Sequence, residues 1–195
     1  MSKRPGLLVL FLLGGGTGAF GGEELWLVLD APAGVSDHLS RFRRMDTPFP
    51  AHVASPPSRA GLADLRISGS SEFSEAGLRM LRARLPVSTF TVVDLREESH
   101  GFAGGLPVSW EANHNWSNVG RSSAQVLEDE RRRLDQLSTQ ARVEPARLDA
   151  RYSRQDVARV PVRPGRVRSE QEVVTGQGLS YERFTVSDHT HPGDA

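Results

Sequence analysis

Residues 91–110 read "TVVDLREESHGFAGGLPVSW", and this stretch decides the fold. The β-branched and aromatic residues from Phe90 to Leu95 predict a buried strand. Three acids, an arginine and a histidine follow at once, and a glycine-rich turn leads into Pro-Val-Ser-Trp. Open α/β sheets place their sites at the carboxyl ends of strands. The polar cluster that begins at Asp94 is therefore a candidate pocket.

The flanking sequence predicts alternating helices and strands. Ser74 is a good N-cap, with Phe73 and Leu78 placed as a hydrophobic staple, and Pro86 ends the helix. Further elements are expected as strands at Leu65–Ile67 and Tyr181–Val186, and as helices at 122–141 and Ser169–Thr175. This order predicts an α/β layered fold with a largely parallel sheet.

The helix expected at 122–141 carries a dense run of charges. Glu128 with Arg132, and Asp129 with Arg133, are each four residues apart, which is the favourable order for ion pairs along a helix. We interpret the run as a solvated helix face.

The composition is that of an ordinary soluble domain, 37% hydrophobic and 25% charged, in a chain of 195 residues. Lysine plus arginine equals aspartate plus glutamate at 24 each, so no overall charge points to nucleic acid or an anionic membrane. Lys3 is the only lysine. Arginine suits bidentate binding of phosphate, but a GC-rich genome gives the same bias.

The first twenty-one residues have the pattern of a secretory signal: a basic start, a short apolar stretch and a small-residue tail. We expect a secreted or periplasmic protein with no membrane attachment once residues 1–21 are cleaved. Residues 22–60 are rich in proline and are expected to form an extended arm, with the α/β domain at 61–195. The chain has no cysteine, so it forms no disulfide.

Two polar clusters are candidate sites, and each has a plainer interpretation. Asp188 and His189 form a proton-transfer pair after a strand, or they belong to a turn before Pro192. Arg96, Glu97 and His100 line a pocket, or they form a buried ion-pair network that braces the loop. His189 and His191 are weak evidence for a metal, and we expect no metal and no cofactor.

Several stretches resemble the protein-tyrosine-phosphatase-like phytases, which are bacterial cysteine phosphatases acting on inositol polyphosphates. The motifs are "DLREESHGFAGGLPVSW", "NWSNVG", "EDERRRL", "LRISGSSEFSEAGLRMLRARLP", "VRSEQEVVTGQGLSYERFTVSDH" and "RFRRMD", across about residues 40–192. The resemblance implies a phosphatase fold in which a cysteine thiolate attacks phosphorus and an aspartate protonates the leaving group.

The resemblance also assigns roles to residues of this chain. Asp188 matches the general acid, while Arg43, Arg96, His100 and His189 are expected to contact an inositol polyphosphate or another phosphate ester. Asp94 and Glu97 are expected to support the pocket.

The chain departs from the family at the nucleophile, because no cysteine and no His-Cys-x-x-Gly-x-Gly-Arg-Thr loop is present. We expect an incomplete, truncated phosphatase that lacks the central strand and the C-terminal helices and is inactive as given. Sheet faces left bare would favour self-association. The alternatives are a secreted polyanion-binding module without catalysis and a structural domain.

Overall fold

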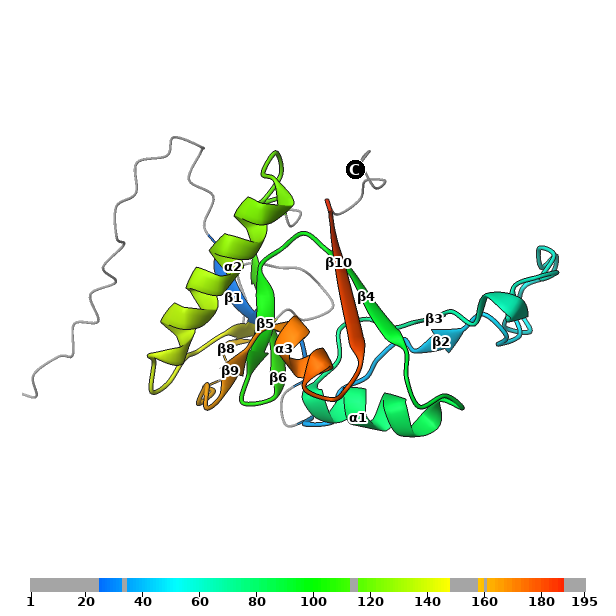
Figure 1. The fold of residues 1–195 in the computed structure, drawn as a ribbon, viewed down its shortest axis with the longest axis horizontal. Coiled ribbons are helices and arrows are strands. Elements are labelled where there is room, and N and C mark those ends of the chain that lie inside the picture. Colours follow the sequence, from blue (N-terminus) through cyan, green and yellow to red (C-terminus); the bar gives the residue numbers. More distant parts are fainter. Residues whose placement is uncertain (1–24, 33–34, 113–115, 148–157, 160, 188–195) are drawn as a thin grey trace, which may run out of the picture.

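The protein was studied as a computed structural model, which describes residues 25–32, 35–112, 116–147, 158–159 and 161–187. Its largest sheet has six strands in the order β8-β7-β1-β6-β5-β9 (Figure 1). The strands are β1 Trp26–Leu29, β5 His100–Ala103, β6 Leu106–Glu111, β7 Ala146–Arg147, β8 Ala158–Arg159 and β9 Val167–Arg168. Within the described ranges, no helix is both long and apolar enough to cross a membrane.

The six-stranded sheet is mainly antiparallel, which corrects the expectation of a largely parallel sheet. Only β1 and β7 run parallel in it. The reason lies in the glycine-rich turn of the opening stretch: Gly104 and Gly105 have φ of 60° and 84° and join β5 to β6 as a two-residue hairpin. Positive φ at both turn residues twists the chain so that the following strand returns antiparallel.

The parallel pairing that the sequence predicted occurs in a separate two-stranded sheet. Strand β4 (Thr91–Arg96) pairs with β10 (Ser180–Val186) in parallel register, with Arg183 opposite Asp94. One face of this pair packs inward, but the other is bare: Val93 and Leu95 are 53% and 56% exposed, and Phe184 is 56% exposed. The expectation of a fully buried strand was therefore wrong for one face.

Three α-helices pack against these strands in the described part of the chain. They are α1 Glu75–Arg84, α2 Ser123–Ser138 and α3 Glu170–Thr175. Each has a serine N-cap whose side chain accepts a backbone N–H, and the N-cap of α1 is the predicted Ser74. Helices α2 and α3 both contact β5 and β10, and so they join the two sheets (Figure 1).

The core consists of two apolar clusters. One packs Phe73, Leu78 and Phe102 with residues of α3 and with Leu179. The other packs Leu29 and Val108 against Leu137 of α2. Phe73 and Leu78, the expected staple, lie in the same cluster.

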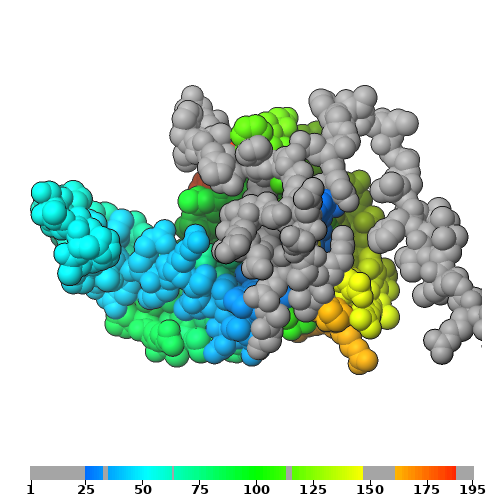
Figure 2. Space-filling model, turned by 180° about the vertical axis from the view of Figure 1, so that it is seen from behind, coloured from blue at the N-terminus to red at the C-terminus, as the bar shows by residue number. Residues whose placement is uncertain are grey.

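The region 22–60 is not a continuous arm, because Trp26–Leu29 forms β1 inside the large sheet, with Val28 and Leu29 buried. The part that projects, which we call the arm, is residues 43–69 (Figure 1; light blue to cyan in Figure 2). In it, β2 (Arg43–Arg44) pairs antiparallel with β3 (Ser68–Gly69).

The strand expected at Leu65–Ile67 was wrong. Leu65 is the last residue of a 3₁₀ helix, η1 (Ala63–Leu65), and β3 begins only after Ile67. Leu65 and Ile67 are both exposed, so their alternation reflected no buried face.

Candidate functional site

The site is organised around Asp94, which lies at the carboxyl-terminal half of β4 and is buried. Its Oδ1 accepts a hydrogen bond from the backbone N–H of Arg96 at 3.0 Å and lies 3.2 Å from Arg96 Nε. Its Oδ2 accepts a hydrogen bond from the hydroxyl of Tyr181 at 2.9 Å and lies 3.0 Å from His100 Nε2. Strand β10 reaches Asp94 because parallel register places Tyr181 and Arg183 beside it.

Glu170 closes the cluster from α3. Its carboxylate binds the Nη2 of Arg96 and lies 3.6 Å from His100 Nε2. The other ring nitrogen of His100, Nδ1, is 2.8 Å from the carbonyl oxygen of Glu98. Both ring nitrogens therefore face oxygen atoms.

Arg183 and Glu130 form a second buried ion pair, at 2.6 Å between Nη1 and Oε2. The remaining nitrogens of Arg183 donate to the carbonyls of Arg96 at 3.1 Å and Glu98 at 2.9 Å. Glu130 also accepts the backbone N–H of His100 at 2.9 Å. We call the set Asp94, Arg96, His100, Glu130, Glu170, Tyr181 and Arg183 the buried network.

Burial and the neighbouring charges lower the pKa of one acid of the network and raise the pKa of another. Burial alone raises the pKa of Asp94, but His100, Arg96 and Arg183 outweigh it and hold that pKa well below its usual range. Burial raises the pKa of Glu170 above its ordinary value, against the opposing effect of Arg96. Burial and the neighbouring Asp94 raise the pKa of Tyr181, so its hydroxyl stays a donor.

Three carboxylates thus face two guanidinium groups and one imidazole. The network is neutral when it holds one extra proton, either on His100 or on Glu170. Asp94, His100 and Glu170 also lie close enough together to be metal ligands. The guanidinium groups of Arg96 and Arg183 already neutralise two of the three acids, so the cluster is built as an ion-pair network and not as a cation site.

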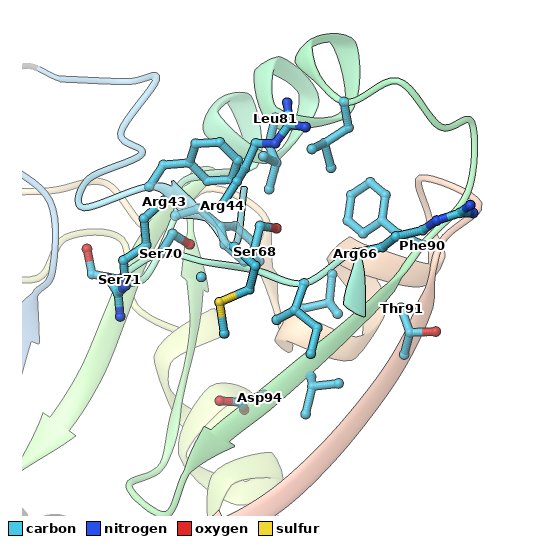
Figure 3. A pocket seen from close by; sticks show the side chains of 18 of the residues that line it. Arg43, Arg44, Arg66, Ser68, Ser70, Ser71, Leu81, Phe90, Thr91 and Asp94 are labelled. Atoms are coloured by element: carbon cyan, nitrogen blue, oxygen red, sulfur yellow. The ribbon is translucent and has the colours of Figure 1, made fainter. Parts of the chain in front are cut away.

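A groove of about 1110 Å³ opens between the arm and β4. Its lining includes Arg43, Arg44 and Arg66 of the arm, and Asp94, Arg96 and Glu170 of the network. Figure 3 shows the arginines on the arm side and Asp94 across the pocket from them. Apolar side chains of α1 and β4 form much of the wall between the two sides.

The structure brings two predicted substrate residues together in this groove and separates a third. Arg43 and Arg96 both line it. His100 does not, since its side chain is 1% exposed and lies within the network, so its expected contact with substrate is corrected to a supporting role. Glu97 is buried too, and Asn118 donates to its backbone carbonyl at 2.9 Å. Asp188 and His189 lie outside the described residues.

Glu130, Glu170, Tyr181 and Arg183 were missed at the sequence level. Glu130 was hidden in the run taken for a solvated face, yet Asp129 and Glu130 are both buried. Asp129 pairs with Arg133 as predicted, whereas Glu128 pairs with Arg131 and not with Arg132. A signal was present, because two apolar residues flank the acids at helical spacing: Val126 and Leu134 are buried on the same side of α2.

No family model matches the chain. A PTP-like myo-inositol phosphatase from Mitsuokella multacida, solved in complex with myo-inositol-(1,3,4,5)-tetrakisphosphate, matches with a TM-score of 0.77 and 33% identity over 90% of this chain. The tandemly repeated PTP-like phytase of the same organism matches equally well, at 0.77 and 32% over 90%. The chain is a relative of the PTP-like phytases.

Two other proteins extend the likeness. A PTP-like phytase from Bdellovibrio bacteriovorus gives a TM-score of 0.57 at 25% identity over 87% of this chain. The effector protein hopD2 of Pseudomonas syringae pv. tomato is 32% identical over 136 residues, or 68% of this chain. The 195-residue chain spans only part of these proteins: 30% of each Mitsuokella chain, 52% of the Bdellovibrio chain and 29% of hopD2. The expected phosphatase-like α/β fold is confirmed by these structures.

Proposed function

We propose that the groove between the arm and β4 binds phosphate esters, and inositol polyphosphates in particular. One observation carries the proposal: Arg43 and Arg96, some fifty residues apart in sequence, line the same groove. Guanidinium groups bind phosphate oxygens through paired hydrogen bonds. The inositol tetrakisphosphate bound to the Mitsuokella relative supports this ligand class.

The proposal assigns each side of the groove a task. Arg43 has its Nη1 donating to the carbonyl of Arg41 at 3.1 Å, and it packs over Gly69, where the Cα hydrogen leaves room for the guanidinium. Arg96 is held in place by Asp94 and Glu170. Two pre-positioned cations bind an anion without first losing side-chain freedom.

The family mechanism uses an aspartate as general acid and a cysteine as nucleophile, and the chain matches the family only at the aspartate. The resemblance gives Asp188, beside His189, the role of protonating the leaving alkoxide in a complete phosphatase, and both residues lie outside the described part of the chain. The 195 residues contain no cysteine, so a phosphocysteine does not form on them. We propose that this polypeptide by itself binds phosphate esters without turning them over.

Export is part of the same proposal. The basic, apolar and small-residue order of residues 1–21 supports a secretory signal, and thus a secreted or periplasmic protein. Expression with residues 1–21 fused to a reporter enzyme that works only outside the cytoplasm tests this, and reporter activity no higher than without the fusion contradicts it.

Calorimetric titration of the purified 195-residue chain with inositol hexakisphosphate tests the binding. We expect saturable binding that weakens as salt rises and that is at least fivefold weaker in Arg43→Ala. Arg142→Ala is the matched control, since Arg142 is exposed, pairs with Glu144 and does not line the groove. Equal affinities of the Arg43 and Arg142 variants would contradict the proposal.

Phosphate release is measured on the same samples. We expect none above the buffer blank from inositol hexakisphosphate. Turnover that survives purification and is lost on replacing Asp188 would refute the non-catalytic part while leaving the binding part intact.

A further inference from the structure

Arg66 is a lining residue of the groove to which the sequence assigned no role. It lies between η1 and β3, lines the groove and has a φ of 50°. We infer that Arg66 is a specificity-determining contact for a second phosphate group, so that the groove discriminates polyphosphates from monophosphates. This inference rests on the proposed function of the groove.

The backbone of Arg66 is fixed in an unfavourable conformation. The left-handed region is unfavourable for a residue with a Cβ, and glycine or asparagine is its usual occupant. Both flanks of Arg66 are fixed: Leu65 ends η1 on one side, and on the other the carbonyl of Ile67 accepts the backbone N–H of Met45 at 3.0 Å. This fixed backbone sets where the side chain of Arg66 starts, and the side chain reaches the groove from there.

The guanidinium of Arg66 also has no partner among the described residues. Among the residues that the structure describes, it makes no hydrogen bond and no ion pair, whereas Arg44 pairs with Asp46 at 2.5 Å and Arg96 pairs with Asp94 and Glu170. Arg43 donates only to a backbone carbonyl. Arg59 of the arm also pairs with no described carboxylate, but it donates to the carbonyl of Met45 and does not line the groove. Arg43 and Arg66 are thus the described arm arginines that line the groove without a carboxylate partner.

The positions of these cations determine what they distinguish. Arg43 lies on β2, Arg66 lies between η1 and β3, and Arg96 lies on β4, so three separate segments bring an arginine to one groove. Figure 3 shows Arg43 and Arg66 among the lining residues. A single phosphate group reaches the cations nearest to it. A ring that carries phosphates on several carbons reaches the others at the same time, and Arg66 adds affinity only for such a ligand.

The test compares Arg66→Asn with Arg41→Asn. Arg41 belongs to the same basic segment and has a φ of 52°, but it does not line the groove. Asparagine tolerates the left-handed region, so each variant keeps its backbone and loses one positive charge. Both variants change the net charge by the same amount, so a larger effect of Arg66→Asn reports its place in the groove.

The probes are inositol hexakisphosphate and phenyl phosphate, titrated into wild type and both variants. For hexakisphosphate we expect Arg66→Asn to bind about five- to tenfold more weakly than wild type, and Arg41→Asn to stay within about twofold. For phenyl phosphate, both variants should match wild type within about twofold.

The outcomes separate this inference from the proposal beneath it. Failure of wild type to bind either probe overturns the proposed function itself. Wild-type binding with equal hexakisphosphate affinities in the two variants overturns only the role of Arg66. An equal loss for both probes in Arg66→Asn also overturns it, because it shows a general anion contact and no discrimination. Thermal melts check folding, and Arg66→Gly repeats the comparison should the asparagine variant melt early.

Discussion

Replacing Arg183 by methionine should be among the most damaging single changes in the buried network. The side chains of Arg183 and Glu130 are only 5% and 7% exposed. Methionine keeps much of the length and apolar stem of the arginine but removes every donor. Glu130 would then be a buried carboxylate without its guanidinium partner, and the carbonyls of Arg96 and Glu98 would lose theirs.

The expected cost is about 3–5 kcal/mol of unfolding free energy, because removing one partner of a buried pair leaves an uncompensated charge. With a urea dependence of about 2 kcal/mol per molar, the unfolding midpoint should fall by about 1.5–2.5 M. Urea titration followed by circular dichroism measures it directly. The loss is a large part of the roughly 5–15 kcal/mol that stabilises a typical domain.

A surface pair on the same helix gives the control. Arg131 and Glu128 also form an ion pair on α2, but both side chains are 64% exposed. Arg131→Met should leave the urea midpoint close to that of wild type, because solvent screens an exposed pair. Double-mutant cycles with Glu130→Gln and with Glu128→Gln isolate the two coupling energies. A midpoint for Arg183→Met within about 0.3 M of the Arg131→Met value would refute the reasoning, since burial would then have no effect on the pair.

Two further predictions concern the same pair of strands. Asp94→Asn should destabilise the protein at pH 7, and its difference from wild type should shrink as pH falls below about 4. The pKa of Asp94 is lowered in the folded state, so the stability it contributes is present above the unfolded pKa near 3.9 and is lost on acidification. Urea midpoints between pH 3 and 7 measure this, and a gap that does not change with pH contradicts it. Separately, sedimentation velocity should show association that rises with concentration and is reduced in the double variant Leu95→Ser, Phe184→Ser. Leu65→Ser, which removes an equally exposed leucine from the arm, should change nothing, and a wild type that stays monomeric at all concentrations rules the association out.

Local signals in the sequence were sufficient for the elements around the site. Ser74 was identified as an N-cap because serine is a preferred residue at that position and an apolar repeat of helical spacing follows it. A serine at the start also marked the helix near Ser169. The strands β4 and β10 were each expected, one from a β-branched and aromatic run and the other from alternation, whereas their pairing with each other was not. Sheet direction was misjudged because no strand was expected on either side of the glycine-rich turn, whose two glycines lie in the left-handed region that makes a tight hairpin.

The buried network was out of reach of local patterns, because four further elements add residues to Asp94 and Arg96 of β4. Glu130 comes from α2, Glu170 from α3, Arg183 from β10 and His100 from β5. Charged residues at i and i+4 give the same sequence pattern whether the helix face is exposed to solvent or buried. Only the tertiary placement of α2 against β5 and β10 decides which acids lose contact with water.

Arg96 belongs to the buried network and also lines the groove. The proposed binding function gives the buried charges around it a purpose, which is to hold its guanidinium group in place. Asp94 holds the Nε of Arg96 and Glu170 holds its Nη2, which leaves Nη1 without a partner among the described residues. The side chain is still 23% exposed at the groove. Two carboxylates thus fix the plane of the guanidinium, and its remaining nitrogen is left for an anion. Fixing that plane in advance avoids the ordering cost that a flexible surface arginine incurs on binding. The burial that makes Arg183 indispensable to stability is, on this argument, what makes Arg96 a prepared binding group.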